Sequence, residues 1–561
     1  MPTSVHWDFL IVGAGSAGCA LANRLSAGGR RVLLLEAGKD TPPGAVPEDI
    51  QDLYPRSYSN PDYFWPGLTA DLGPVGRPDA RPFFQQARVM GGGSSVMGML
   101  ALRGLPDDYD GWAAAGARGW AWSDVLPYFR RLESDWDFAG PMHGADGPVP
   151  IRRHRAADWP PFCRAIGEAA VARGYPILAD LNAEFDDGYC ALPLSATLSG
   201  RVSSATAYLD AATRARANLR VECETFVERL LFEGRRCAGV ETVSRGERRT
   251  FRAANVIVSA GGIHSPTVLL RSGIGPAEEL RHLGVPVVAA SSGVGRNLQN
   301  HPVVYVAAHL TEEARQSTLL RLPILTCLRF SSGKDPALRT DMMIMVLSQS
   351  SWHGLGRSIA ALGVSVYRPF SRGTVRLASP DPHVPPDIGF EYLSDPRDRS
   401  RMIFGYRLGV SLMMDPAVRA LRHRAFSSGD SAAARRLNRP GPLNQAAAAL
   451  LAASLDGPEW LRGLVMRRLV APGEPDETRM LDEDWLAATV GERTFGMYHP
   501  SGTCRMGGDD DPNAVLDPHC RVRGVDRLSV VDASVMPTLI RGNTNIPTIM
   551  VAEKAADLLR R

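Results

Sequence analysis

Three glycines near the start of the chain have the spacing that phosphate-binding turns use. Gly13, Gly15 and Gly18 form the pattern GxGxxG, and Glu36 lies further along the chain. The first glycine permits a tight turn, the second lets the backbone approach a pyrophosphate, and the third permits close packing of a helix on a strand. A glutamate at this distance can accept hydrogen bonds from a ribose diol and would repel a 2′-phosphate. The residues therefore predict a dinucleotide site that disfavours NADP, and by themselves they leave FAD and NAD both open.

The segments around these glycines predict the strand–helix–strand unit that a dinucleotide fold needs. Residues 8–13 (DFLIVG) and 31–36 (RVLLLE) are continuous apolar runs typical of buried parallel strands. Between them, residues 16–26 place apolar side chains along one face of a helix. The N-terminus of that helix would present free N–H groups and a partial positive charge to the phosphates.

A second glycine-rich stretch has three consecutive residues without side chains. Gly91, Gly92 and Gly93 are followed by Ser94 and Ser95. Such a stretch can lie against a large planar or charged ligand and donate N–H and O–H groups to it. A flexible loop uses the same residue types, so this stretch does not by itself distinguish the two.

Length, composition and charge indicate an ordinary globular protein. The chain has 561 residues, which is enough for two substantial lobes. Apolar residues make up 44% and charged residues 22%, and 63 basic side chains nearly balance 60 acidic ones to give a net charge of +3. A balance this even provides no electrostatic reason to expect binding to nucleic acid or to an anionic membrane surface.

The cysteines and the N-terminus bear on the compartment. The 8 cysteines are spread singly, without CxxC pairs or zinc-ligand spacing, so we expect reduced structural thiols and no metal site. The N-terminus has no signal-peptide pattern, and no apolar run reaches the length of about 18 residues that a spanning helix needs. We therefore expect a cytoplasmic protein without a transmembrane segment, and we leave peripheral membrane contact open.

Changes in sequence pattern predict a cofactor lobe assembled from separate parts of the chain. Its first part is 1–155, which includes an excursion rich in Pro, Asp, Tyr and Gly at 41–86. A second part, 156–310, also contains some segments of the other lobe, and the last part is 491–561. The block 311–490 mixes strands with alanine-rich helix and is the predicted substrate-binding domain.

Periodicity predicts further elements in these parts. We expect helices at 159–173, 445–455 and 548–559, and strands at 219–243, 246–260, 373–378 and 528–532.

Five blocks, in chain order, closely resemble the signatures of the glucose–methanol–choline (GMC) oxidoreductases. They span nearly the whole chain, although the segment 302–493 is much less diagnostic. The blocks are 87–112 (ARVMGGGSSVMGMLALRGLPDDYDGW), 261–275 (GGIHSPTVLLRSGIG), 294–302 (VGRNLQNHP), 498–506 (YHPSGTCRM) and 531–553 (VDASVMPTLIRGNTNIPTIMVAE).

The resemblance implies an α/β fold, with a Rossmann-like FAD-binding domain and a discontinuous α+β substrate-binding domain built on an antiparallel sheet with helices. It also implies oxidation of an alcohol carbon by hydride transfer to the flavin. The implied FAD contacts are Gly13, Gly15, Ser16, Ala17, Gly18, Glu36, Ala37, Arg88, Gly92, Ser95, Val96, Met97, Met99, Val227, Ala260, Asp532, Ala533, Asn543 and Thr544.

Two positions depart from parts of the family. Some members have a histidine, bonded covalently to the flavin, where this chain has Val96. Valine cannot make that bond, so we expect FAD to be bound noncovalently. Many members have Asn where this chain has Met97, so no side-chain hydrogen bond is expected from that position.

His499 and Asn543 match the positions that the family uses for catalysis. An imidazole suits a general base because its reference pKa of about 6.5 leaves the neutral form available near pH 7. Pro500, Ser501 and Gly502 favour a turn that can aim the ring into a cavity. The resemblance therefore implies His499 as the base and Asn543 as a donor to the substrate oxygen, and it leaves open how the two share these roles.

The end of the chain supplies a helix that would face the flavin. Residues 542–545 offer turn and cap residue types, and Pro547 suits the first position of a helix. The resemblance implies that the N-terminus of this helix points at the pyrimidine side of the flavin, where its partial positive charge would stabilise an anionic form.

Several other residues receive a structural interpretation. Cys504 lies close to His499 in the chain, but a structural thiol is expected there, and structural roles are also expected for His264 and His301. The arginines 435, 436 and 439 are expected on a solvated face. Apolar walls for a substrate are expected from Met97, Met99, Tyr498 and Trp352.

The function expected from these residues is FAD-dependent oxidation of a primary alcohol to an aldehyde, with oxygen or another acceptor reoxidising the flavin. Choline-like, aromatic, furanic and aliphatic alcohols stay open, because no cage for a quaternary ammonium can be assigned. A flavin-dependent lyase or decarboxylase on the same fold is the alternative, although the presence of both His499 and Asn543 argues against it. A non-catalytic flavin-binding protein is a third hypothesis. No nucleic-acid partner is expected, and the oligomeric state is left open.

Overall fold

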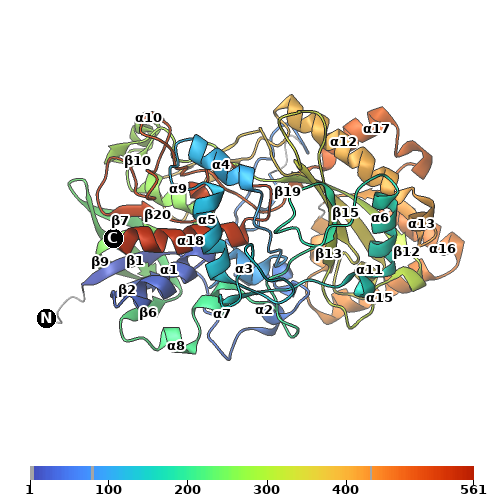
Figure 1. Ribbon diagram of the computed structural model, residues 1–561, viewed down its shortest axis with the longest axis horizontal. Coiled ribbons are helices and arrows are strands. Elements are labelled where there is room, and N and C mark those ends of the chain that lie inside the picture. The colour runs from blue at the N-terminus through green and yellow to red at the C-terminus, as the bar shows by residue number, and fades with distance from the viewer. Residues whose placement is uncertain (1–5, 77–80, 430–431, 561) are drawn as a thin grey trace.

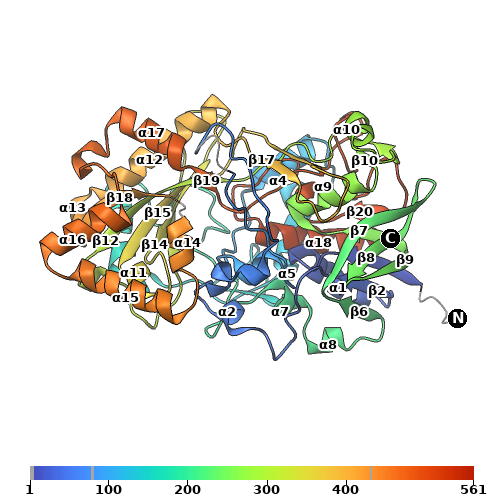
Figure 2. The same ribbon diagram turned by 180° about the vertical axis from the view of Figure 1, so that it is seen from behind.

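The protein has two lobes, each built around one large sheet, as Figures 1 and 2 show from opposite sides. The computed structural model describes residues 6–76, 81–429 and 432–560, so residues 77–80 of the predicted excursion 41–86 lie outside the described part. Both ends of the chain lie in one lobe, and the other lobe is at the opposite end of the molecule. The predicted fold class, an α/β lobe with a discontinuous second lobe on an antiparallel sheet, is confirmed.

The sheet of the first lobe combines a parallel and an antiparallel part. The parallel strands come from the beginning, middle and end of the chain, which is why this lobe is discontinuous in sequence. The meander of three antiparallel strands continues the sheet at β9. In spatial order the strands are β6 (Leu219–Glu222), β2 (Val32–Leu35), β1 (Trp7–Val12), β9 (Glu247–Val258), β8 (Arg236–Ser244) and β7 (Thr225–Glu233), and β20 (Leu528–Val530) also pairs with β9.

The predicted strand–helix–strand unit is confirmed as β1, α1 (Ser16–Ala27) and β2. Its two strands are fully or nearly fully buried because both faces of the sheet are covered. Gly18 lies in the first turn of α1, where a Cβ atom would collide with the carbonyl oxygen of Gly13. Only a glycine at this position lets the helix begin so close to the strand.

The last helix of the chain, α18 (Asn545–Arg560), packs along α1 and α5 (Trp122–Leu132). It starts three residues earlier than predicted, so Pro547 is its third residue and not its first; its missing N–H is harmless because the first N–H groups of a helix have no intrahelical partner. The fully buried carboxylate of Glu553 anchors the helix by accepting hydrogen bonds from Arg24, Arg131 and Tyr208.

The sheet of the second lobe is antiparallel throughout. Its first strand in sequence lies far from the others in the chain, which makes this lobe discontinuous as well. In spatial order the strands are β18 (Arg422–Ser428), β12 (Pro302–Leu310), β15 (Ile359–Val366), β14 (Met342–Leu347), β13 (Ile324–Phe330) and β5 (Gly188–Ala191), with β19 (Phe495–Gly496) paired to β12.

One face of this sheet is covered by long helices. The helix α12 (Pro396–Met413) packs on the central strands, α6 (Pro161–Val171) packs on the β13–β5 side, and α17 (Glu483–Arg493) packs on α12. The side chains between them form a core of mainly Val, Leu, Ile and Met. The predicted helix at 159–173 is therefore confirmed as α6, whereas the strand predicted at 373–378 is only β16 (Thr374–Arg376), which pairs with β17 (Asp387–Gly389) outside the large sheet.

Three helices close the outer end of the second lobe. They are α14 (Ala432–Leu437), α15 (Pro442–Asp456) and α16 (Glu459–Val465), followed by a π-helical turn at Met466–Val470. The alanine-rich helix predicted at 445–455 is confirmed as α15.

Shorter elements connect these parts. The remaining helices are α2 (Glu48–Gln51), α3 (Gly93–Val96), α4 (Pro106–Ala114), α7 (Ser204–Tyr208), α8 (Ala211–Arg214), α9 (Gly261–Arg271), α10 (Ala277–His282), α11 (Gly354–Arg357) and α13 (Pro416–Arg419), and the remaining strands are β3 (Glu133–Asp135), β4 (Val149–Ile151), β10 (Ile274–Gly275) and β11 (Ala289–Ala290). In the described part of the chain, no helix combines the length and apolar character needed to cross a bilayer.

All eight cysteines are free thiols, seven of them buried and Cys223 partly buried. Burial raises the pKa of every one of these thiols, to about 12 at Cys163, Cys190 and Cys237. At neutral pH they are therefore uncharged, which fits the structural role predicted for Cys504.

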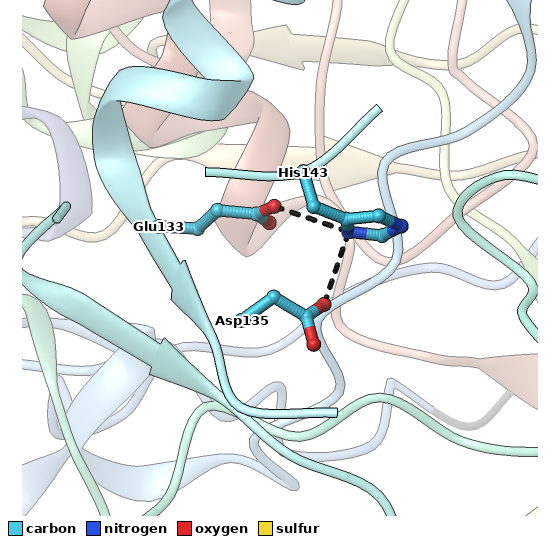
Figure 3. A group of neighbouring side chains, drawn as sticks. All are labelled: Glu133, Asp135 and His143. Carbon is cyan, nitrogen blue, oxygen red and sulfur yellow. Dashed lines mark ion pairs between the residues drawn. The ribbon is translucent and has the colours of Figure 1, made fainter. Parts of the chain in front are cut away.

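A buried group of charged side chains joins β3 to the loop that precedes β5. Figure 3 shows the imidazole of His143 beside the carboxylates of Glu133 and Asp135. Its Nδ1 lies 3.4 Å from Glu133 Oε1 and 3.1 Å from Asp135 Oδ2, and its Nε2 lies 2.9 Å from Asp180 Oδ2. Burial by itself would lower the pKa of His143, but the close carboxylates of Asp135, Asp180 and Glu133 outweigh it and raise the pKa to about 10.

The charges in this group already balance. Arg103 pairs with Glu133, and Arg153 pairs with both Asp135 and Asp180 at 2.9 and 2.7 Å. Three carboxylates thus face two guanidinium groups and one protonated imidazole. A metal ion would have to displace the imidazole proton and would add uncompensated charge, so we interpret the group as a structural ion-pair network.

We predict that the network makes the stability of the protein depend on alkaline pH. A raised pKa in the folded state means that the His143 contribution is complete below the unfolded-state pKa of about 6.5 and is lost as the pH rises towards 10. The apparent melting temperature should therefore fall between pH 7 and pH 10, and His143→Gln should flatten this slope. The exposed His519 is the matched control, and an equal flattening by His519→Gln would contradict the assignment.

Candidate active site

A cavity of about 1980 Å³ runs from the glycine-rich turn after β1 into the second lobe. At one end it is lined by Gly13 and Gly15, in the middle by His499 and Asn543, and at the other end by Leu451 and Leu469 of the outer helices. Both lobes therefore contribute walls to the same space.

The glycine-rich end of the cavity is built from two segments that touch. The amide of Gly91 donates to the carbonyl of Ala14, and Gly92, with φ +55, lies so close to Gly15 that a Cβ atom would come within 2.9 Å of its Cα. The first residue outside α1 is Gly15, and no side chain caps the helix there. The free N–H groups at the start of α1 are therefore available to a phosphate in the cavity.

Glu36 lies at the end of β2, beside the same part of the cavity. One of its carboxylate oxygens accepts a hydrogen bond from the amide of Ala14 and the other accepts one from Gly38, each at 2.8 Å. Burial raises the pKa of Glu36, and the two amides act in the opposite direction. Each oxygen keeps a lone pair that can accept a bond from a ribose hydroxyl.

Most of the predicted cofactor residues line the cavity, and three do not. The three are Gly18, whose role is helix packing, Arg88, whose Nε donates to the carbonyl of Ala37, and Ser95, whose Oγ donates to the carbonyl of Met90. The lining residues are Gly13, Gly15, Ser16, Ala17, Glu36, Ala37, Gly92, Val96, Met97, Met99, Val227, Ala260, Asp532, Ala533, Asn543 and Thr544.

A buried polar atom in the cavity wall lacks a protein partner. The ring of His264 packs against Trp65 with a centroid distance of 4.3 Å, and its Nε2 makes no hydrogen bond within the described part of the chain. Burial lowers the pKa of His264 to about 3, so the ring is neutral. An unpaired polar atom, an uncapped helix N-terminus and a carboxylate with free lone pairs, all along one cavity, fit a dinucleotide cofactor such as FAD.

Three segments from distant parts of the chain meet around His499. The backbones of Gln299 and Ser501 exchange two hydrogen bonds of 3.0 Å, and the side chain of Gln299 bonds to Pro537 and Leu539. The turn at Pro500 also packs directly on Gly262 at the start of α9. The blocks that the sequence analysis found separately are therefore parts of one site.

His499 and Asn543 face each other in the cavity, with Nε2 of the imidazole 3.1 Å from Nδ2 of the amide. The residue before the histidine, Tyr498, has φ +62, a left-handed conformation that is uncommon for a residue with a side chain. The amide of His499 donates to Oδ1 of Asn300 at 2.8 Å. The backbone that leads into the imidazole is therefore held in place.

His301 determines which nitrogen of His499 carries the proton. Its Nε2 lies 3.1 Å from the carbonyl oxygen of Ile540, and its Nδ1 lies 2.9 Å from Nδ1 of His499. A carbonyl can only accept, so Nε2 of His301 must donate, and its Nδ1 is then a bare acceptor because burial keeps this ring neutral. Nδ1 of His499 must therefore donate, which leaves the lone pair on its Nε2.

The rest of the geometry agrees with this assignment. The amide nitrogen of Asn543 can donate to the lone pair on Nε2 of His499, and its Oδ1 accepts from the hydroxyl of Tyr367 at 3.4 Å. The rings of Tyr367 and His301 stack at 4.4 Å. Burial also lowers the pKa of His499 to about 3, so its imidazole is neutral at ordinary pH and the lone pair is available.

Two sequence interpretations change in this site. His301 was expected to be structural, but it contacts His499 directly, and Tyr367 was not identified at all. Trp352 was expected in the substrate wall, and this is wrong: its indole N–H donates to the carbonyl of Asn438, and the cavity is lined by its neighbours 351 and 353. Met97, Met99 and Tyr498 do line the cavity.

Comparisons with known protein sequences match the chain over nearly its full length. The profile of the GMC oxidoreductase family matches residues 7–303 with its N-terminal part and residues 369–552 with its C-terminal part. The chain is 40% identical to 5-(hydroxymethyl)furfural oxidase of Methylovorus sp. (strain MP688), with 99% of both chains covered. It is 35% identical to the mitochondrial choline dehydrogenase of Homo sapiens, with 99% of this chain and 90% of the relative covered.

Solved structures show the same fold. The crystal structure of pyridoxine 4-oxidase from Mesorbium loti superposes with a TM-score of 0.80 at 27% identity and covers 98% of this chain and 99% of that one. The fold of this chain therefore has a counterpart in an experimental structure.

We predict that replacing His301 releases the tautomer of His499. In His301→Phe the ring can still stack on Tyr367, but Nδ1–H of His499 and the carbonyl of Ile540 lose their partners, at a cost of about 1–3 kcal/mol each. Long-range ¹H–¹⁵N correlation spectra of ¹⁵N-histidine-labelled protein should show His499 protonated at Nδ1 in the wild type and as a tautomer mixture in the variant. In His301→Asn an amide oxygen can replace the acceptor, so this control should keep the wild-type signal; an Nε2–H signal in the wild type would refute the assignment.

Proposed function

The chain belongs to the GMC oxidoreductase family, and on that premise we propose that it oxidises a primary alcohol to an aldehyde with His499 as the base and Asn543 as the orienting donor. It is an FAD-dependent oxidoreductase that acts on CH–OH groups, as the members of this family are. The observation that carries the residue roles is the 3.1 Å contact between the unprotonated Nε2 of His499 and the amide of Asn543 inside the cavity.

The base has to accept the hydroxyl proton of the alcohol. The lone pair on Nε2 of His499 points into the cavity, because Nδ1 is held by His301. The hydrogen bond from Nδ1–H of His499 to Nδ1 of His301 also stabilises the positive charge that forms on the imidazole of His499 when Nε2 is protonated. His301 is in this proposal a positioning residue, because of the two histidines only His499 contacts the alcohol.

Asn543 has to hold the alcohol oxygen in place. Without substrate, a hydrogen of Nδ2 can point to the single lone pair on Nε2 of His499; when the alcohol binds, its hydroxyl takes over that lone pair and Nδ2 donates to the alcohol oxygen. A hydroxyl in front of the pair can therefore donate to Nε2 and accept from Nδ2. The Tyr367 hydroxyl, bonded to Oδ1, keeps the amide in the orientation that this donation needs.

FAD, bound along the cavity, supplies the two-electron acceptor for the hydrogen that leaves the carbon. The protein contributes the position of the alcohol between two buried side chains, His499 and Asn543. It also places the N-terminus of α18 two residues after Asn543, where its partial positive charge favours negative charge in the cavity.

The walls of the substrate end favour an uncharged alcohol with an apolar or flat body. Met99, Met345, Tyr305 and Phe495 line this part of the cavity, and methionine and aromatic side chains adapt to flat rings. The 40% identity to an oxidase named for 5-(hydroxymethyl)furfural supports a furanic or aromatic primary alcohol.

A quaternary ammonium substrate fits this cavity less well. It needs a carboxylate in the wall that is free to face the cation in a desolvated site. Two carboxylates of the second lobe line the cavity: Glu474 is already bonded to Arg493 and to the amide of Ser427, and Glu492 is exposed, so that water screens its attraction for a cation. We therefore propose a neutral alcohol in preference to choline.

We predict that His499→Ala abolishes most of the reduction of bound flavin by alcohols while leaving the protein folded and yellow. Loss of a general base costs about 10²–10⁴-fold in rate. Anaerobic mixing with a panel of furanic, aromatic, aliphatic and choline-type alcohols, followed by flavin absorbance, measures this rate. The exposed His519 provides the matched control, because His519→Ala removes an imidazole far from the cavity lining.

Two outcomes would overturn the proposal. Wild-type rates in His499→Ala would exclude the imidazole as the base. If no alcohol reduces the wild-type flavin, but a carboxylic acid loses carbon dioxide under light, the alternative of a flavin-dependent decarboxylase on this fold takes its place. Hydrogen peroxide release compared with dye reduction then distinguishes oxygen from another acceptor.

We also propose that FAD is held without a covalent bond. Val96, whose side chain is fully buried among Ile50, Tyr63 and Phe64, lines the cavity but has no atom that can bond to the flavin ring. Acid precipitation of the holoenzyme should therefore release free FAD into the supernatant. Flavin that stays in the washed pellet would contradict the proposal.

A further inference from the structure

The outer end of the second lobe is covered by what we call the cap, residues 434–470, which carry α14, α15 and α16 and the π-helical turn. In both views of the molecule α15 and α16 lie at the end furthest from the chain termini. The cap is not part of the catalytic geometry described above.

The helix α15 is apolar on both of its faces. Its inner side is formed by Ala448 and Leu455, two turns apart, which are completely buried. The opposite side presents Leu443 and Leu450, which are 85% and 70% exposed, together with the exposed alanines 446 and 453. A helix at a protein–water boundary normally places polar residues on its solvent-facing side. The exposed apolar side of α15 therefore indicates a surface that binds a partner.

The apolar surface continues over α16 and the following turn. Trp460 is 70% exposed, and Leu464 and Leu469 are 45% and 63% exposed. Leu443 and Leu450 lie on the adjacent helix, because α15 and α16 pack against each other, and Leu469 lies in the π-helical turn that follows α16.

The charges around this surface are predominantly positive. The exposed arginines of the cap are 436, 439, 467 and 468, whereas its acidic residues are only Asp456 and Glu459. Asp456 is moreover paired with Arg315 outside the cap. Although the net charge of the whole chain is near zero, the surface of the cap therefore combines apolar side chains with an excess of positive charge.

We propose that the cap docks on the surface of a bilayer that contains anionic phospholipid. Leucine and tryptophan side chains enter the boundary between headgroups and acyl chains, and arginines bond to the phosphates. With 15 residues α15 is too short to span a bilayer, so it lies in the interface. A second copy of the chain fits less well, because a two-fold contact through this surface would bring its arginines face to face.

The cap also lines the far end of the cavity. Leu437, Leu451, Leu469 and Val470 are among the lining residues. Docking would therefore bring this end of the cavity to the lipid interface, where alcohols that partition into the membrane are concentrated. The inference goes beyond the proposed function and does not depend on it.

Co-sedimentation of the holoenzyme with phospholipid vesicles tests this proposal. Wild-type protein should bind vesicles of phosphatidylcholine mixed with phosphatidylglycerol, and should bind pure phosphatidylcholine vesicles more weakly. Leu443→Glu/Leu450→Glu should weaken binding to both by about tenfold or more. Arg467→Gln/Arg468→Gln should weaken binding to the mixed vesicles alone, on the order of tenfold, and binding to them should fall with salt.

The control carries the same charge change outside the cap. Ile177 and Leu198 are 53% and 78% exposed, and Ile177 lies beside β5 at the opposite edge of the sheet. Ile177→Glu/Leu198→Glu should bind vesicles as the wild type does. All three variants must keep wild-type turnover of a water-soluble alcohol, which shows that they are folded.

Three results would overturn the proposal. The first is failure of the wild type to bind the mixed vesicles, and the second is equal loss of binding in the cap and control variants. The third is a two-chain mass in light scattering that Leu443→Glu/Leu450→Glu converts to one chain, because the surface would then be covered by a second copy.

Discussion

The proposed chemistry depends on a chain of hydrogen bonds whose direction is set by a single backbone carbonyl. Ile540 has no proton to give, so each following link has only one arrangement: His301 donates to it, His499 donates to His301, and the amide of Asn543 meets the remaining lone pair. A neutral imidazole has two equivalent-looking tautomers in water. In this protein the fold selects one of them before any substrate arrives, so the base does not have to change its tautomer when the alcohol binds.

The links of this chain come from loops, but each loop is held by regular structure close by. His301 precedes β12, the long strand of the second lobe, and His499 follows β19, which pairs with that strand. Asn543 lies two residues before α18, whose position on the first lobe is fixed by the buried carboxylate of Glu553. Short connections therefore join the site to regular structure in both lobes. They leave the side chains of His301, His499 and Asn543 little freedom to move.

The sequence predicted what depends on local pattern or on family motifs. The β1–α1–β2 unit follows from neighbouring residues, and the proximity of His499 and Asn543 follows from the resemblance. The part played by His301 did not follow, because it depends on how residues 299 and 501 pair across 202 positions of chain. The prediction for Trp352 was wrong for a related reason. Its neighbours line the cavity, but the local backbone directs its own side chain towards Asn438. The net charge of the whole chain likewise did not reveal the excess of arginines in the cap.

The burial of the cysteines affects how resistant the protein is to oxidation. Peroxide attacks the thiolate form of cysteine, and the damage proceeds through sulfenic to irreversible sulfinic and sulfonic acids. Because burial keeps all eight side chains protonated, almost no thiolate is present even at Cys504, in the same turn region as His499. When oxygen serves as the electron acceptor, the protein produces hydrogen peroxide inside its own cavity. Because its thiols stay protonated, they react slowly with that peroxide.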